Sequence, residues 1–154
     1  MLVRYPAPMK VVLQRVSQAS VSVDDTVVGA IQHGFVLLVG FGKGDTAECI
    51  QPMVDKIVKM RIFENEAKRF DKDIIEVGGE ILAISQFTLF ADTAKGRRPE
   101  FFQALEPAAA SQLFDAFVEA LRKTSLKKVE TGVFGAHMKI SLINDGPVTI
   151  SLER

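Results

Sequence analysis

The sequence predicts an α+β fold, in which two main helices pack on a mixed, largely antiparallel β-sheet. Short β-rich runs outnumber helical segments along the chain. Only two stretches place apolar residues at helical spacing. Neither a repeat nor a linker interrupts the 154 residues. We therefore expect a single domain over residues 9–154, preceded by a flexible extension over residues 1–8.

The first half of the chain is predicted to form strands and then a helix. Four β-rich runs come first, at residues 10–16, 21–23, 27–31 and 35–41. The run at 35–41 is continuously apolar, which is typical of a central strand buried on both faces. Helical spacing follows in the apolar residues Ile50, Met53, Val54, Ile57 and Val58. Pro52 lies inside this pattern, so the helix should break there or begin near it.

The second half continues with a charged loop at 64–73, a strand at 80–90 and a basic loop at 92–100. The second helix should begin at Pro107, a favourable first-turn residue. Its predicted buried face consists of Leu113, Phe114, Phe117, Val118 and Leu121. A glycine-rich stretch then leads to two alternating strands, and Asn144-Asp145-Gly146 between them indicates a tight hairpin turn.

Composition restricts the classes of function. Nineteen basic residues balance nineteen acidic ones, which argues against a protein that wraps long nucleic acid but leaves room for a local basic contact. A single cysteine, Cys49, excludes an internal disulfide and fits a reducing compartment. No apolar run reaches the roughly 18 residues of a membrane span, and residues 1–8 lack a signal peptide. We expect a cytoplasmic protein without a membrane contact.

Few residues suit ordinary catalysis. His33 and His137 lie in turn-like, glycine-rich surroundings where a solvated side chain is the simpler interpretation. No cluster of Cys, His and carboxylates has metal-site spacing, so neither a metal nor another cofactor is expected. Cys49 is most simply a small core residue.

The segment SQFTLF at 85–90 has two interpretations. It can be a plain strand with hydroxyls on a half-buried surface, or a site wall that offers hydroxyls and amides to a substrate. Thr88 would need an adjacent base to act as a nucleophile, and none is evident. The basic loop at 95–98 can be a solvated surface or, beside Phe101-Phe102, can hold phosphates and stack a base.

Four segments taken together are more specific than any of them alone: SQFTLFAD at 85–92, GRRP at 96–99, TGVFGAHM at 131–138 and NDGPVT at 144–149. QRV at 14–16 and RIF at 61–63 precede them in the expected order. In this pattern the chain resembles the D-aminoacyl-tRNA deacylases, the DTD family, from Met9 to Arg154.

The resemblance implies a barrel-like core and a homodimer that hydrolyses the ester between a D-amino acid, or glycine, and the 3′ end of tRNA. Gly146-Pro147 would be a cis peptide that reaches into the partner's active site and rejects L-amino acids, with Arg15 holding this segment in place. Main-chain atoms and side chains of Ser85, Gln86, Phe87 and Thr88 would form the catalytic site, assisted by the 2′-hydroxyl of the RNA. The wall for the terminal adenine would consist of Phe134, Gly135, Ala136 and Met138.

Two departures from the family pattern stand out. Residues 67–74 read AKRFDKDI where the family has a different loop sequence, and Phe90 replaces a residue that is commonly small. Two other functions remain open from the sequence. One is an esterase that uses Thr88 as its nucleophile. The other is a non-catalytic module that binds RNA ends or DNA.

Overall fold

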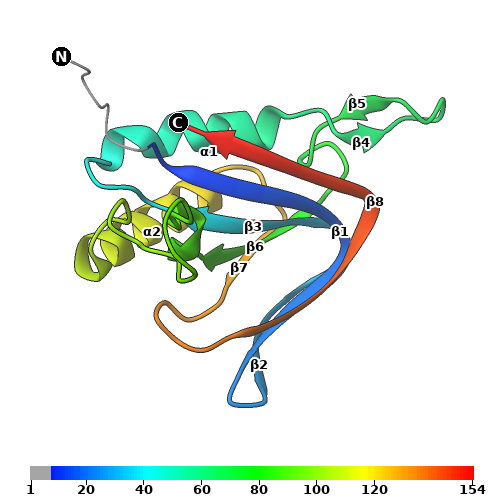
Figure 1. The fold of residues 1–154 in the computed structure, drawn as a ribbon. Helices are drawn as coiled ribbons and strands as arrows, with labels where there is room; N and C mark the ends of the chain where they lie inside the picture. Colours follow the sequence, from blue (N-terminus) through cyan, green and yellow to red (C-terminus); the bar gives the residue numbers. More distant parts are fainter. Residues whose placement is uncertain (1–7) are drawn as a thin grey trace.

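The computed structural model describes residues 8–154 and confirms the α+β prediction, with a nearly closed, barrel-like sheet and two helices (Figure 1). The elements in chain order are β1 (Lys10–Val23), β2 (Thr26–Ile31), β3 (Gly34–Gly40), η1 (Ala47–Cys49), α1 (Ile50–Lys59), β4 (Phe63–Glu64), β5 (Phe70–Lys72), β6 (Glu80–Ser85), η2 (Phe87–Phe90), α2 (Pro107–Arg122), β7 (Lys128–Thr131) and β8 (Lys139–Glu153). Except for Pro8, the extension expected at 1–8 lies outside the described residues. None of the helices within 8–154 is long and apolar enough to cross a membrane.

The main sheet is organised around β1. Its strand order is β2-β1-β3-β6-β7, and β8 also pairs with β1. The pairs of β1 with β2, β3 and β8 are antiparallel, whereas β3-β6 and β6-β7 are parallel. In Figure 1, β8 follows β1 along its whole length and curves with it around the sheet. This mixed pairing confirms the predicted sheet type.

Strand β1 is longer than the sequence indicates. The two runs expected at 10–16 and 21–23 form one strand. The polar residues Ser17 and Gln18 between them are exposed, and Gln18 pairs with Ile143 of β8. The first part of β1 pairs with β3 and the last part with β2. The polar residues therefore mark the point where β1 changes partners.

The helices cover one face of the sheet. All five residues that were predicted to be buried on α1 are buried. Pro52 is the third residue of α1, where its missing N–H removes no intrahelical bond. On α2, four of the five predicted positions are buried and Leu113 is half-buried. The opposite face of β3 packs into a second apolar cluster through Val36, which confirms that this strand is buried on both faces.

The strand predicted at 80–90 ends early, at Ser85. Its parallel partner β3 ends at Gly40, and the last register pair is Val39 with Ser85. Without a partner the chain turns into η2, so the alternating faces expected for residues 85–90 do not form. Gln86 still donates its backbone N–H to Val39 O at 2.7 Å, which anchors η2 to the end of β3.

The charged segment at 64–73 is exposed, as expected, but it is not simply a loop. It forms the small antiparallel pair β4-β5. The turn is closed by the Asn65 side chain, whose Oδ1 accepts the backbone N–H groups of Ala67 and Arg69 at 2.9 and 3.1 Å. Lys68 takes a positive φ of 58° in this turn.

The segment at 144–148 is not a hairpin turn. Both flanking runs belong to β8 and pair with β1, with register pairs Val16–Asn144 and Gln14–Thr149. Only Arg15 lies between these partners on β1, so residues 145–148 form a bulge in a continuous strand. Asn144 closes it, accepting the Val148 N–H at 2.7 Å and donating to Thr149 Oγ1 at 2.9 Å.

Candidate active site

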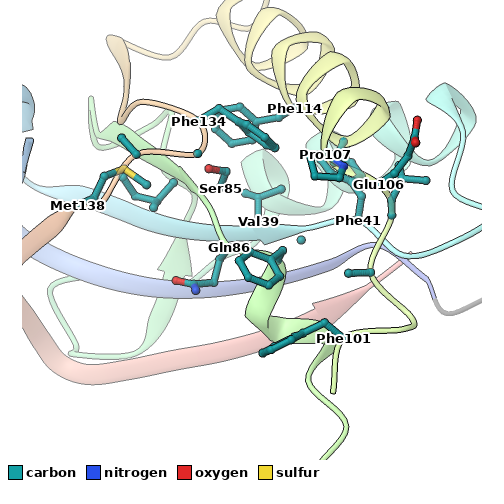
Figure 2. Close-up of a pocket in the computed structure, with 18 of the residues that line it drawn as sticks. Val39, Phe41, Ser85, Gln86, Phe101, Glu106, Pro107, Phe114, Phe134 and Met138 are labelled. Atoms are coloured by element: carbon teal, nitrogen blue, oxygen red, sulfur yellow. The ribbon is translucent and has the colours of Figure 1, made fainter. Parts of the chain in front are cut away.

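A cavity of about 570 Å³ opens where the parallel strands β3 and β6 end (Figure 2). Its floor is formed by the ends of these strands, including Val39 and Ser85. The start of η2, the segment leading into α2, and residues 134–138 form the walls. Carboxyl ends of neighbouring parallel strands meet at one edge of a sheet, which is a common position for a ligand site.

Aromatic rings dominate the walls. Phe87 and Phe101 meet edge to face, with ring centroids 5.0 Å apart and an interplanar angle of 65°. Phe114 of α2 and Phe134 have ring centroids 6.3 Å apart. Figure 2 shows Phe114 and Phe134 on one side of the cavity and Phe101 on the other. Such walls suit a planar group such as a nucleobase.

The predicted site residues fall into two groups in the structure. Seven of them line the cavity: Ser85, Gln86, Phe87, Phe134, Gly135, Ala136 and Met138. Thr88 is the next residue of η2, but it is exposed and is not among the described residues that line the cavity. Its hydroxyl accepts a hydrogen bond from the side-chain amide of Gln86, which is not a base.

Backbone amides also provide polar groups at this end of the sheet. The first two amides of η2, those of Phe87 and Thr88, have no acceptor inside a 3₁₀ helix. The 3₁₀ bond from Leu89 N–H to Gln86 O, at 3.3 Å, comes only after them. An oxygen that gains negative charge near residues 86–88 can therefore accept from the main chain.

Two ionisable residues of the cavity wall were not predicted. Glu106 precedes Pro107 at the start of α2, and His137 belongs to the segment that walls the cavity. The position of His137 within TGVFGAHM was the available signal. For Glu106, no local pattern distinguishes a site residue from an ordinary residue before a helix.

Gly146 and Pro147 lie away from the cavity of their own chain. The bond between them is cis, and both residues are exposed. The bulge lies beside Arg15, which pairs with Phe35 at the start of β3, whereas the cavity lies at Val39 and Gly40. Along β1, Arg15 is four residues from the partner of Val39 and five from the partner of Gly40, or roughly 14–17 Å at about 3.4 Å per residue.

Arg15 connects three segments of the chain. Its side chain is buried, donating from Nε to Asp145 O at 2.9 Å and from Nη1 to Ile62 O at 2.7 Å. Glu64 of β4 lies 3.7 Å from Nη2, and the ring of Phe70 on β5 lies 5.7 Å from the guanidinium carbon. Arg15 thus contacts both the bulge of β8 and the β4-β5 pair. The role that the resemblance implies for it, holding the Gly-Pro segment in place, stays a prediction.

Neither Cys49 nor the glycine-rich turn at 40–44 offers a second reactive site. Burial, and then the nearby Asp45 carboxylate, raise the pKa of the Cys49 thiol to about 11, so little thiolate exists near neutral pH. A glycine-rich turn can bind phosphate through its backbone amides. In this turn, however, the Gly42 N–H already donates to Asp45 Oδ2 at 2.6 Å. Burial also raises the pKa of Asp45.

Comparisons with known proteins relate this chain to enzymes that act on aminoacyl-tRNA. The sequence profile of the D-Tyr-tRNA(Tyr) deacylase family matches residues 12–153. The chain belongs to this family. D-aminoacyl-tRNA deacylases of Clostridium perfringens and Thermomicrobium roseum are each 51% identical to it over 145 residues, covering 94% of this chain and 97% and 94% of theirs.

Two solved structures have a similar fold. A structure described as c-Myc DNA Unwinding Element Binding Protein has a TM-score of 0.87 and 41% identity, and the match covers 94% of this chain and 98% of that one. A probable eukaryotic D-amino acid tRNA deacylase has a TM-score of 0.81 at 19% identity, which shows the shared fold.

Proposed function

We propose that this protein hydrolyses the ester that joins a D-amino acid, or glycine, to the 3′ end of tRNA. The observation that carries the proposal is the meeting of residues 85–87 with residues 134–138 around one aromatic cavity, in a chain of this family. The terminal adenine stacks on the wall that includes Phe134 and Met138, and the ester lies near η2.

Catalysis by this site relies on positioning. The carbonyl oxygen of the ester gains negative charge as water attacks, and the free amides of Phe87 and Thr88 stabilise that charge. The 2′-hydroxyl of the terminal ribose stands beside the ester and assists the attack. This assignment fits the exposed Thr88 hydroxyl, whose neighbour is the Gln86 amide.

Chiral selection requires a second copy of the chain. Gly146 and Pro147 are exposed and do not line the cavity of their own chain, so they serve the cavity of a partner. Within residues 8–154, β8 pairs only with β1, which leaves its other edge open for association. Main-chain atoms of the inserted segment hold the α-amino group and exclude an L side chain, whereas a D side chain points outward and glycine has none to exclude.

The test is amino-acid release from D-Tyr-tRNA, L-Tyr-tRNA and Gly-tRNA, measured in parallel with the purified protein. We expect rapid loss of the D-tyrosyl and glycyl esters and survival of the L-tyrosyl ester. Equal cleavage of all three esters contradicts the chiral gate. Sedimentation of the same sample should give the mass of a dimer, and a monomer that retains selectivity would contradict the role of the partner.

Thr88→Ala is expected to keep hydrolysis of D-Tyr-tRNA within about tenfold of the unchanged protein, because the hydroxyl has no base to activate it. Thr26→Ala, which changes another exposed threonine outside both the cavity and the basic loop, is the matched control. Initial rates under single-turnover conditions report the chemical step. Loss of all activity in a folded Thr88→Ala protein, or an acyl-enzyme isolated from the unchanged protein, would favour the threonine esterase instead.

A binding module without catalysis is the second candidate. The structure with 41% identity is described as a DNA unwinding element binding protein, and the exposed basic loop at 92–100 fits contact with phosphates. This function predicts binding of nucleic acid with no ester cleavage in the three-substrate test. The absence of net charge gives it little long-range attraction for nucleic acid.

A further inference from the structure

We propose that the loop at residues 92–100 binds the sugar-phosphate backbone of the tRNA acceptor end and supplies much of the affinity for the whole tRNA. The proposal rests on the proposed function, which brings the RNA 3′ end into the cavity. It assigns a separate task to the loop, because the cavity receives the last nucleotide and the loop holds the nucleotides before it.

The cavity itself cannot neutralise phosphates. Its lining within the described residues includes no lysine and no arginine, and its one acidic side chain is Glu106. Phosphate contacts from basic side chains commonly provide most of the affinity of a protein for nucleic acid and fix its register. For a substrate as highly charged as tRNA, these contacts must come from residues beside the cavity.

The loop presents three cations from a fixed stem. Asp92 and Glu100 exchange two backbone hydrogen bonds, of 2.7 and 2.9 Å, at its base. The Asp92 carboxylate also accepts the Ala94 N–H at 2.9 Å, and Gly96 takes a positive φ of 69° at the turn. The cations at the tip are Lys95, Arg97 and Arg98, and all three are exposed.

The stem joins the loop directly to the cavity wall. Phe101 follows Glu100 in the chain, lines the cavity and packs edge to face on Phe87. Figure 2 shows Phe101 at the edge of the cavity, with the chain continuing away from it. A nucleic acid that leaves the cavity past Phe101 therefore meets the basic tip next.

The three cations are available for a ligand. Within residues 8–154, the ion pairs at 4.0 Å or less involve Arg15, Arg61, Arg122 and Lys128, and none involves the loop. Lys56, Lys59 and Arg154 form a second exposed basic group, around a shallow hollow at the end of α1 that shares no residue with the cavity. This remote group provides a control of equal charge.

The experiment compares the triple variant K95Q/R97Q/R98Q with the control K56Q/K59Q/R154Q and with the charge-preserving K95R/R97K/R98K. Each protein is tested on D-Tyr-tRNA and on the minimal ester 3′-O-D-tyrosyl-adenosine. We expect the loop variant to lose about 10- to 100-fold in kcat/KM on the tRNA, with hydrolysis of the adenosine ester within twofold of the unchanged protein. The other two variants should stay within about threefold on both substrates.

Salt dependence gives a second readout that needs no catalysis. Affinity for uncharged tRNA is measured between about 50 and 200 mM salt, a range over which phosphate contacts weaken strongly. Loss of three cations should reduce the slope of log affinity against log salt by about 2, since each single-stranded phosphate contact contributes roughly 0.7. An unchanged slope and unchanged kcat/KM on tRNA would overturn the proposal, as would an equal loss on the adenosine ester.

Failure of the proposed function gives a different pattern. If the unchanged protein cleaves neither ester, the deacylase assignment fails, but the salt slope for uncharged tRNA still tests the loop. If the control variant loses affinity as much as the loop variant does, the attraction depends on total charge and the specific role of the loop is overturned.

Discussion

Replacing Arg15 with alanine is expected to lower the free energy of unfolding by about 3 kcal/mol and to reduce D-Tyr-tRNA hydrolysis about a hundredfold. The side chain is only 5% exposed and satisfies two backbone carbonyls, those of Asp145 and Ile62. Hydrogen bonds from a charged donor contribute about 1.5–3 kcal/mol each, and removal leaves the acceptors without their partner. Activity falls because the bulge that carries Gly146 is no longer held by the Arg15 side chain, which contacts both Asp145 and Glu64 of β4.

The measurement combines thermal unfolding with rates on D- and L-Tyr-tRNA. For a chain of this size, about 3 kcal/mol corresponds to a decrease in Tm of roughly 6–12 °C. Arg15→Lys should be intermediate, because an ammonium group lacks the planar fork that reaches both carbonyls. The ratio of D to L cleavage should fall together with the rate, and this ratio separates a positioned gate from a general loss of stability.

Arg61→Ala is the matched control for Arg15→Ala. Arg61 is exposed, with its Nη1 4.0 Å from the Asp71 carboxylate, and exposed pairs of this kind stabilise a protein by at most about 1 kcal/mol. We expect little change in either unfolding or hydrolysis. An Arg15→Ala protein with normal stability and normal D/L selectivity would show that the bulge needs no support from β1.

Local sequence patterns correctly predicted the helices and strands in which buried residues recur at regular spacing. The helical spacing at Ile50–Val58 predicts a helix with one buried face, and the apolar run at 35–41 predicts a strand buried on both faces. The structure confirms both elements. Proline at position 107 likewise begins α2 as expected. These features follow from residues near one another in the sequence.

The elements that differ from prediction depend on distant partners. Strand β6 ends because β3 ends, and residues on either side of Asn144 stay in one strand because β1 pairs with both parts. No pattern within SQFTLF or NDGPVT carries that information. The turn chemistry of Asn-Asp-Gly instead closes a bulge through the side chain of Asn144.

The candidate site was predicted in its sequence segments but not in its arrangement. Residues 85–87 and 134–138, which the resemblance assigns to the site, line one cavity, and their roles stay a prediction. Phe114 joins the cavity from α2, a helix that the sequence assigned only to the core, and Glu106 joins it from the residue before that helix. The separation of the bulge from the cavity of its own chain is a property of β1 register. Only the fold can reveal it.

Gly146→Ala is expected to reduce kcat/KM on D-Tyr-tRNA about a hundredfold. The φ of Gly146 is +147°, a conformation that residues with a side chain rarely adopt. A Cβ built there would also lie 2.8 Å from Val148 Cγ2 and 3.0 Å from Val148 N, so the bulge must shift. A displacement of about 1 Å at a positioning group is enough for a loss of this size.

Gly78→Ala separates the role of Gly146 from backbone strain. Gly78 also has a positive φ, of +65°, but a Cβ there meets no atom within 4 Å, and the residue does not line the cavity. This control should lose about 1 kcal/mol of stability and keep its hydrolysis rate and selectivity. We propose that the bulge serves the partner's cavity. Mixing Gly146→Ala with an excess of a cavity variant such as Phe134→Ala should then restore part of the activity, since each mixed dimer keeps one intact pairing of bulge and cavity. If mixing restores nothing while mixed dimers form, the bulge acts within its own chain or not at all.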